Sequence, residues 1–528
     1  MQRMTKFFLN GSLLAVTSLL LRLTGLGFSA YMTLHLGAEG TGLLSLVTTV
    51  YGFGITLAVS GIYLACMRLC SSAIVQKNAF ALHTAMQKSF LHAIVFGCIS
   101  FFILFNAASF LGTQFLGDAR STEAIKTLAI ALPFIAMTTV TDSYFASVGR
   151  VYKSAISDIV EEVTKIFIGI LLLKSALPFG IEAGVTAVTK GNCIGEIIAF
   201  IVSFIMYHKD IKTFDKQKQQ YTAKTESLLR ISLPIALSTY ARSGLVTIEH
   251  SLIPKGLQQY GQNKSNALAE YGIVRGMSLP IILFPASVLS SFTGLLIPEF
   301  TEDFVAENRQ GINKKASVSM DLSCVFSIVS AGILFAFGKE LGICIYKNAD
   351  AGRFIRYFSF LIPFMYCDTT ADSMLKGMDK QVYTMIVNIM DAAISVVMTK
   401  TLIPKYGLLG YIVTVFTTEI LNFLFSFSKL ASITELRLRP VHSVCLPLLI
   451  CCITTALSRQ LLTLLHITSM RLFCITGIIF SLITCVPVIM QFSFLSLFQN
   501  QKTKQSRQQK TQRKPDWESA VKKAEIIR

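Results

Sequence analysis

Arginines within long apolar stretches are the residues of this sequence with the most distinctive chemistry. A charge at the centre of a membrane helix costs about 2.5 to 3.5 kcal/mol, so it must face another charge, a cavity or water. Arg22, Arg242 and Arg275 stand in such stretches. A guanidinium group keeps its charge and donates paired hydrogen bonds that match phosphate oxygens. These arginines therefore predict a binding site for pyrophosphate. The alternative is that internal carboxylates neutralise them and the resulting ion pairs only lock helices together.

Carboxylates also stand within apolar stretches, and they do so at equivalent positions of two repeated parts of the sequence. Asp142 corresponds to Asp372 and Glu196 to Glu419, because the sequence around each pair is repeated. We expect these four residues to bind a coupling sodium ion or proton, or to pair with the arginines when the protein closes. A symmetric fold would also preserve a purely structural polar group at such positions, and this interpretation stays open.

Other chemistry is not indicated. Glu161 and Lys165 have the i, i+4 spacing of an intrahelical ion pair, which we interpret as structural. The twelve cysteines lack CxxC spacing and the seven histidines show no metal-binding pattern, so we expect neither disulfides nor a metal site. Because the chain has no Walker A loop and no GxSxG motif, it is not expected to be an enzyme or to hold a cofactor.

Composition places these charges in a bilayer. Charged residues make up 15% of the chain and hydrophobic residues 52%, which is too few polar groups to cover a water-facing surface of this size. Apolar runs of about 20 residues cross the hydrocarbon as helices, since only helices or closed barrels satisfy their backbone there. The runs lack the alternation of barrel strands, so the predicted class is an all-α membrane protein.

An internal repeat organises the chain. The stretch 133–152, PFIAMTTVTDSYFASVGRVY, returns as 363–383, PFMYCDTTADSMLKGMDKQVY, and the same offset carries Gly42 onto Gly272. With a slightly shorter offset, Arg22 falls on Arg242. A repeat of this length indicates a duplicated half rather than a chance motif.

The apolar pattern predicts fourteen membrane segments. They cover residues 7–36, 41–67, 89–115, 124–147, 154–176, 184–207, 228–252, 270–298, 317–342, 354–376, 381–403, 408–430, 441–465 and 470–497. Residues 1–212 and 213–436 then form two six-helix lobes, related by a pseudo-twofold axis along the membrane normal and facing a central cavity. Residues 437–498 add two helices, and 499–528 form a basic tail that we expect to be disordered.

Lysine and arginine are more frequent in the loops on the side of the N-terminus, which predicts that both termini are cytoplasmic. The basic tail is expected to lie against anionic lipids, and the net charge of +18 does not argue for a nucleic-acid partner. Because one chain contains both lobes, we expect a monomer.

Several motifs carry a family likeness. LLLRLTGLGFSAYMTLHLGAEGTGLLSL near the start, YFASVGRVYKSAISDIVEEVTK from Tyr144 and MLKGMDKQVYTMIVNIMDAAISVVMTKTLIPKYGLLGYIVTV from Met374 occur in order. Over all but the tail, the chain resembles the stage V sporulation protein B type flippases of the multidrug/oligosaccharidyl-lipid/polysaccharide (MOP) exporter superfamily, which are related to lipid II flippases.

This resemblance implies a V-shaped pair of six-helix lobes that moves a polyprenyl-pyrophosphate-linked oligosaccharide, a peptidoglycan or polysaccharide precursor, across the bacterial cytoplasmic membrane by alternating access. It also implies that the two extra helices, within 437–498, form a groove for the lipid tail and that Arg22 and Arg275 line the cavity. Two arginines of lipid II flippases are absent here, near Phe28 and in VTTVYGFGITL, which leaves other lipid-linked oligosaccharides open as the substrate.

Two other functions compete with this one. A cation-coupled multidrug antiporter of the same superfamily would usually have twelve helices and an acidic cavity. A membrane scaffold for glycan synthesis would recruit partners through the basic tail and transport nothing.

Overall fold

The computed structural model describes residues 2–59, 61–76, 78–212, 228–464, 469 and 472–485. Every secondary-structure element in these ranges is a helix, which confirms the predicted all-α class. The connection 213–227, the end of the last predicted segment and the tail 499–528 lie outside the described residues.

The first half of the chain contains α1 (Gln2–Val59), α2 (Ile62–Val75), α3 (Ala79–Phe110), η1 (Leu111–Phe115), η2 (Ala119–Ser121), α4 (Thr122–Ala129), α5 (Leu132–Val148), α6 (Tyr152–Ala176), η3 (Leu177–Phe179) and α7 (Ile181–Ile211). The second half contains α8 (Leu228–Gln259), α9 (Lys264–Gly272), η4 (Ile273–Ser278), α10 (Leu279–Val305), α11 (Arg309–Tyr346), α12 (Ala349–Ser359), α13 (Ile362–Gly377), α14 (Gln381–Tyr406) and α15 (Leu408–Ile433). The chain continues with η5 (Val441–Cys445), α16 (Leu446–Leu464) and a helix over Leu472–Cys485.

Length and composition make eight of the described helices able to cross a membrane, or nine if the bent pair α4 and α5 counts as one span. The predicted number of fourteen is therefore not confirmed. One candidate span, Thr17–Val75, contains two of the predicted segments, which are separated by a kink at Gly37 with φ 71° and ψ −178°. The helices α6, α8 and the pair α12 and α13 cover further predicted segments, but they are not long and apolar enough to count as membrane spans.

The repeat is visible as the same break in both halves. Helices α4 and α5 meet at a bend of 42°, and Pro133 stands in the first turn of α5. Helix α12 likewise ends just before α13, whose first turn contains Pro363. Proline has no N–H for the preceding helix and fits the first turn of a new one, so the repeated proline restarts the helix in each half.

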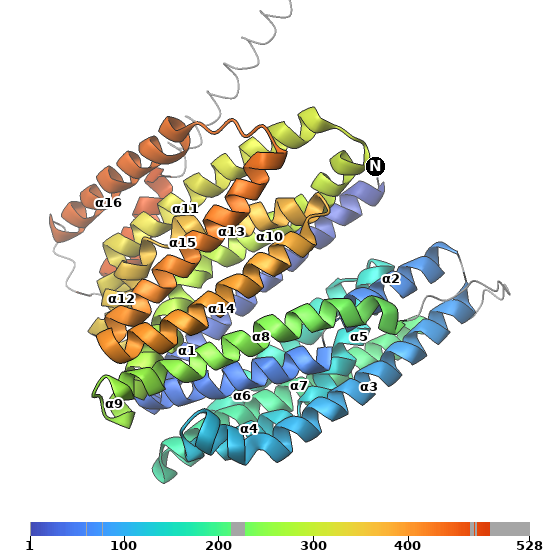
Figure 1. Ribbon diagram of the computed structural model, residues 1–528, viewed down its shortest axis with the longest axis horizontal. Helices are drawn as coiled ribbons and strands as arrows, with labels where there is room; N and C mark the ends of the chain where they lie inside the picture. The colour runs from blue at the N-terminus through green and yellow to red at the C-terminus, as the bar shows by residue number, and fades with distance from the viewer. Residues whose placement is uncertain are drawn as a thin grey trace, which may run out of the picture.

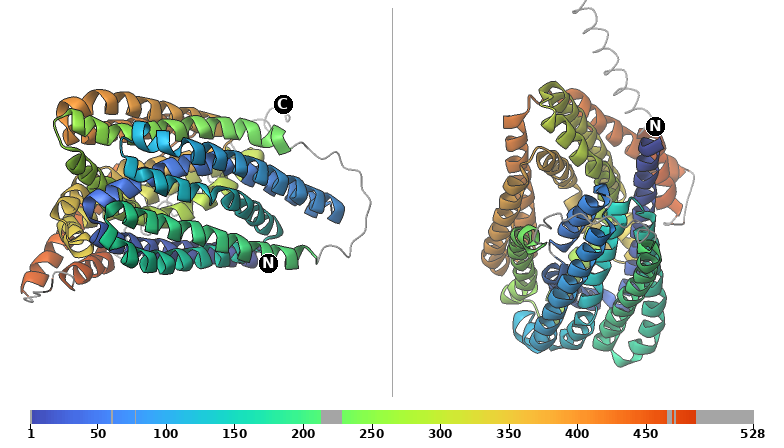
Figure 2. Two further views of the ribbon diagram at one scale, coloured as in Figure 1. Left: turned by 90° about the horizontal axis from the view of Figure 1, so that it is seen from below. Right: turned by 90° about the vertical axis from the view of Figure 1, so that its right-hand side faces the viewer.

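The helices form two lobes that together have the shape of a V (Figure 1). Helices α2 to α7 with the second half of α1 make the N-terminal lobe, and α10 to α15 make the C-terminal lobe; α8 packs along α14. The lobes converge at the end that carries α4 and α9, here called the α9 end. They diverge toward the end at which α1 begins, and the side view in Figure 2 shows the same helices running lengthwise between these two ends.

Two repeated glycines meet where the lobes converge. A Cβ atom built on Gly42 would lie 2.0 Å from the carbonyl oxygen of Leu268, and one on Gly272 would lie 2.2 Å from that of Ala38 and 2.6 Å from the amide nitrogen of Gly42. Residues that are related by a pseudo-twofold axis touch only when they lie on it. The axis expected from the repeat therefore passes between Gly42 and Gly272, and only glycine permits this backbone approach.

Helix α16 packs on α11 at the outside of the C-terminal lobe (Figure 1). Residue numbers increase in the same direction along both sides of this contact. Ser443 of η5 donates to Asp321, Cys451 contacts the carbonyl of Val329, and Arg459 pairs with Glu340. The two helices therefore run parallel. They cover the ninth and thirteenth predicted segments, which cross the membrane in the same direction.

Candidate functional site

Arg22 lies on the first half of α1 and faces the C-terminal lobe. It lines a pocket of about 240 Å³ between α1 and α10, together with Gly25, Leu26, Ser29, Pro280, Leu283 and Phe284. Its guanidinium interacts electrostatically with Tyr366 of α13. Among the described residues, no carboxylate lies within ion-pair distance of Arg22. The side chain is exposed, so its donors are available to a ligand.

Arg242, the repeat partner of Arg22, lies on α8 at the other seam between the lobes. In this seam, Ser243 donates to Thr56 at 3.1 Å and Tyr240 to the carbonyl of Leu57 at 3.1 Å. Arg242 interacts electrostatically with the carboxylates of Asp391 and Glu419.

Arg275 lies on η4, a short π-helical stretch next to the contact between the repeated glycines. π-Helical bulges are frequent at functional sites because they re-aim a side chain. Arg275 is half-buried and interacts electrostatically with Glu249, His250, Tyr271 and Tyr411. The three predicted arginines thus lie on three different elements, and Arg22 lines the pocket between α1 and α10.

In the N-terminal lobe, the predicted carboxylates gather around one lysine. Glu196 on α7 interacts electrostatically with Asp142 on α5 and with Glu161 and Lys165 on α6. Lys165 forms an ion pair with Glu162, and it also interacts electrostatically with Glu161, its predicted partner. Both carboxylates lie one turn from Lys165 on the same face of α6, and spacing alone does not choose between them.

In the C-terminal lobe, Asp372 has a full set of partners. It accepts hydrogen bonds from Ser426 at 3.0 Å and from Asn388 at 3.3 Å, and Lys376 lies 3.7 Å away. Glu419 on α15 interacts electrostatically with Asp368, Asp391 and Arg242, as well as with Glu249. The two predicted carboxylates of this lobe therefore belong to one polar region between α13, α14 and α15.

Asp368 and Asn422 are site residues that sequence reasoning missed. The amide nitrogen of Asn422 donates to Oδ2 of Asp368 at 3.0 Å. Oδ1 of each side chain has no hydrogen-bond partner among the described residues, although Asp368 is only 8% exposed and Asn422 9%. Asp368 stands four residues before Asp372, on the same face of α13, and this spacing was an available signal. The two unpartnered oxygens can accept a proton or ligate a small cation, since buried polar atoms are normally satisfied. No group of three or more His, Cys, Asp or Glu side chains suited to a metal ion occurs in the described ranges.

Comparison with known proteins gives a family and a fold. A family model described as "Polysaccharide biosynthesis protein" matches residues 8–304. Stage V sporulation protein B of Bacillus subtilis (strain 168) is 22% identical over 430 residues, which cover 78% of this chain and 82% of that protein.

Two solved structures share the architecture. A multidrug resistance transporter of the MATE family and MOP superfamily, in an inward-facing conformation, superposes with a TM-score of 0.62 at 13% identity, over 79% of this chain and 98% of that one. The lipid II flippase MurJ, in an inward closed conformation, superposes with a TM-score of 0.61 at 12% identity, over 92% of this chain and 99% of that one. At these identities the likeness establishes that the fold is shared.

Proposed function

Since the chain belongs to the polysaccharide biosynthesis protein family, we propose that it is a flippase that carries a polyprenyl-pyrophosphate-linked oligosaccharide across the cytoplasmic membrane by alternating access. A lipid-linked sugar needs a polar cavity for its head group, an apolar surface for its tail and two lobes that can rock about the bound head group.

The observation that carries this proposal is the environment of Arg22. Its guanidinium lines a pocket between α1 and α10, and no described carboxylate lies within ion-pair distance of it. An unpaired guanidinium in a site of low dielectric constant attracts a pyrophosphate, and its planar donors fit the phosphate oxygens in pairs. Arg242 and Arg275 interact with acidic residues, which partly balance their charge, so we assign them a secondary role.

Orientation supports loading from the cytoplasm. The excess of lysine and arginine on the side of the N-terminus puts that end inside the cell. The lobes diverge toward this end and meet at the α9 end, so this conformation receives the substrate from the inner leaflet. The lipid tail is assigned to α16 and the helix Leu472–Cys485, which expose large apolar side chains such as Leu457 and Ile475.

Coupling is assigned to the polar region of the C-terminal lobe. Asp368 and Asn422 offer two unpartnered buried oxygens, and Asp372 lies one turn away. A proton or sodium ion bound there would change the charge of the region and thereby the relative stability of the two conformations. Asp142 and Glu196 are the corresponding candidates in the N-terminal lobe.

A cation-coupled multidrug antiporter is the second candidate, favoured by the MATE-like fold and by the carboxylates in both lobes. Arg22 argues against it, because a cationic drug is repelled by an unneutralised guanidinium.

The test is flipping of a fluorescent polyprenyl-pyrophosphate sugar in proteoliposomes. Arg22→Ala should abolish flipping, and Arg22→Lys should retain a minor part of it, because lysine keeps the charge but loses the paired donors. Arg353→Ala is the matched control, since Arg353 on α12 is exposed and pairs only locally with Asp350. Normal flipping by Arg22→Ala would contradict pyrophosphate recognition by this residue. Export of cationic dyes without lipid flipping would establish the antiporter.

A further inference from the structure

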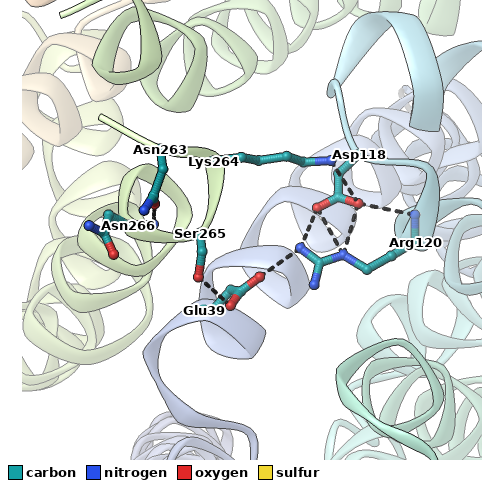
Figure 3. A network of polar contacts seen from close by, with 7 residues as sticks. All are labelled: Glu39, Asp118, Arg120, Asn263, Lys264, Ser265 and Asn266. Carbon is teal, nitrogen blue, oxygen red and sulfur yellow. Dashed lines mark hydrogen bonds and ion pairs between the residues drawn. The ribbon is translucent and has the colours of Figure 1, made fainter. Parts of the chain in front are cut away.

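A network of five polar side chains joins the lobes at the α9 end (Figure 3). Its N-terminal part is assembled around Arg120. One terminal nitrogen of Arg120 lies 2.8 Å from Glu39 and 2.7 Å from Asp118, and Nε donates to Asp118 at 3.0 Å. Glu39 lies in the second half of α1, just after the kink at Gly37, and Asp118 and Arg120 lie at η2 before α4, so the three residues belong to one lobe.

The other side of the network is formed by the first two residues of α9, which continues through η4 into α10 of the C-terminal lobe. Ser265 donates its hydroxyl to Oε2 of Glu39 at 2.5 Å, and the ammonium of Lys264 lies 3.4 Å from Asp118. The start of α9 is held in place because the side chain of Asn263 caps it by accepting from the amide of Asn266 at 2.8 Å (Figure 3). Each cross-lobe contact therefore joins one preformed part to another.

The charges of the network are balanced only while the lobes are together. Glu39 and Asp118 carry two negative charges, and Arg120 and Lys264 carry two positive ones. Burial acts to raise the pKa of Asp118, but its hydrogen bonds and charge interaction with Arg120, together with Lys264, outweigh burial and lower it, so the carboxylate is ionised. If the lobes part, the N-terminal part keeps one excess negative charge and exposes it to water.

Arg120 keeps the N-terminal side of the network in place whether the lobes are together or apart. It pairs with both carboxylates of its own lobe, so Glu39 and Asp118 remain in position when the partner lobe leaves. Re-forming the contacts then requires little ordering of side chains on that side, which lowers the entropic cost of closure. Glycines Gly42 and Gly272 lie close by in the chain, and their backbone approach depends on the same convergence of the lobes.

We propose that Glu39, Asp118, Arg120, Lys264 and Ser265 form a latch that closes the outer side of the protein, with Arg120 as its fixed centre and the two contacts from α9 as its releasable part. This inference rests on the proposed alternating-access function, because only a protein that opens on both sides needs such a latch.

The experiment is hydrogen–deuterium exchange of the full chain in lipid nanodiscs, read by mass spectrometry over residues 38–46 and 266–276. Ser265→Ala should raise the population open at the α9 end by roughly tenfold, since it removes a hydrogen bond to a charged group. Glu39→Gln keeps an acceptor for Ser265 but removes its charge, so it should raise this population by about threefold. Lys264→Gln should also raise it by about threefold, because the ammonium is farther from its partner and half-exposed. The double variant Glu39→Gln with Ser265→Ala should exchange no faster than Ser265→Ala alone, because both changes act on one shared contact.

Lys126→Gln is the matched control. Lys126 pairs with Glu123 at 2.9 Å, and both residues belong to α4, so this ion pair does not join the lobes. Exchange equal to wild type in all the latch variants, or fully additive effects in the double variant, would overturn the latch. Exchange needs no substrate. A chain that flips the lipid but shows no change in exchange therefore refutes only the latch, whereas faster exchange in a chain that flips nothing supports the latch and refutes the proposed substrate.

Discussion

Replacing Gly42 by alanine tests whether the backbone contact between the lobes controls opening at the α9 end. The added Cβ would lie 2.0 Å from the carbonyl oxygen of Leu268, a distance at which two such atoms overlap. Because real contacts of this kind begin near 3.0 Å, the two backbones must separate by 3.0 − 2.0 = 1.0 Å. The atom that blocks the methyl group is backbone, so no side-chain rotation relieves the overlap.

The expected effect follows from the cost of overpacking. Inserting a methyl group into a close contact costs about 1–3 kcal/mol. Only the closed state has this contact. The ratio of open to closed protein should therefore be about five- to 150-fold higher in Gly42→Ala than in the wild type. Alanine also favours a helix by about 0.8–1.0 kcal/mol over glycine, but this gain applies to both states and leaves their ratio unchanged.

The assay is the same exchange measurement over residues 266–276, accompanied by thermal unfolding to show that the variant is folded. Gly52→Ala is the matched control, because it lies on the same helix and a Cβ there would meet no atom within 4 Å. Gly272→Ala should reproduce the effect from the other lobe, since its Cβ would lie 2.2 Å from the carbonyl oxygen of Ala38. If Gly42→Ala and Gly52→Ala exchange alike, the contact of the repeated glycines does not hold the lobes together, and the reasoning fails.

Two further predictions concern coupling and the tail. Asp368→Asn keeps a hydrogen-bonding group beside Asn422 but removes a charge, so flipping should lose its dependence on a sodium or proton gradient while the substrate still binds; unchanged gradient dependence in proteoliposomes would exclude Asp368. Deletion of residues 499–528 should leave flipping intact, because the pocket at Arg22 and both lobes lie within the remaining chain; loss of glycan synthesis in cells with normal flipping in vitro would instead point to a scaffold.

The repeat shows how far sequence reasoning reaches. The offset that aligns Pro133 with Pro363 predicts equivalent elements, and both halves do restart a helix at that proline. The same offset pairs Gly42 with Gly272, and these residues touch in the structure. Composition likewise determined the helical membrane class. The length and apolarity of each run are enough to predict a membrane helix, whichever helices pack against it.

The partners of the charged residues could not be obtained in this way. The spacing within α6 offers Lys165 two acceptors, and the ion pair within 4 Å is with Glu162, which spacing alone does not single out. Asp368 and Asn422 lie 54 residues apart, and nothing in either helix alone indicates that they meet. The count of fourteen spans stays a prediction, because eight described helices, or nine with the bent pair, have the length and composition of a membrane span.

The latch illustrates the physical reason. Glu39, Asp118 and Lys264 lie on or beside three separate helices, α1, η2 and α9, and nothing in the sequence around each of them indicates its partners. They meet because the lobes converge at the α9 end, and that convergence depends on how whole helices rotate and cross when their side chains interdigitate. The sequence by itself determined which residues lie on which helix and that the halves match. Only the tertiary structure decided which charges face one another, because this depends on packing between helices that are distant in the chain.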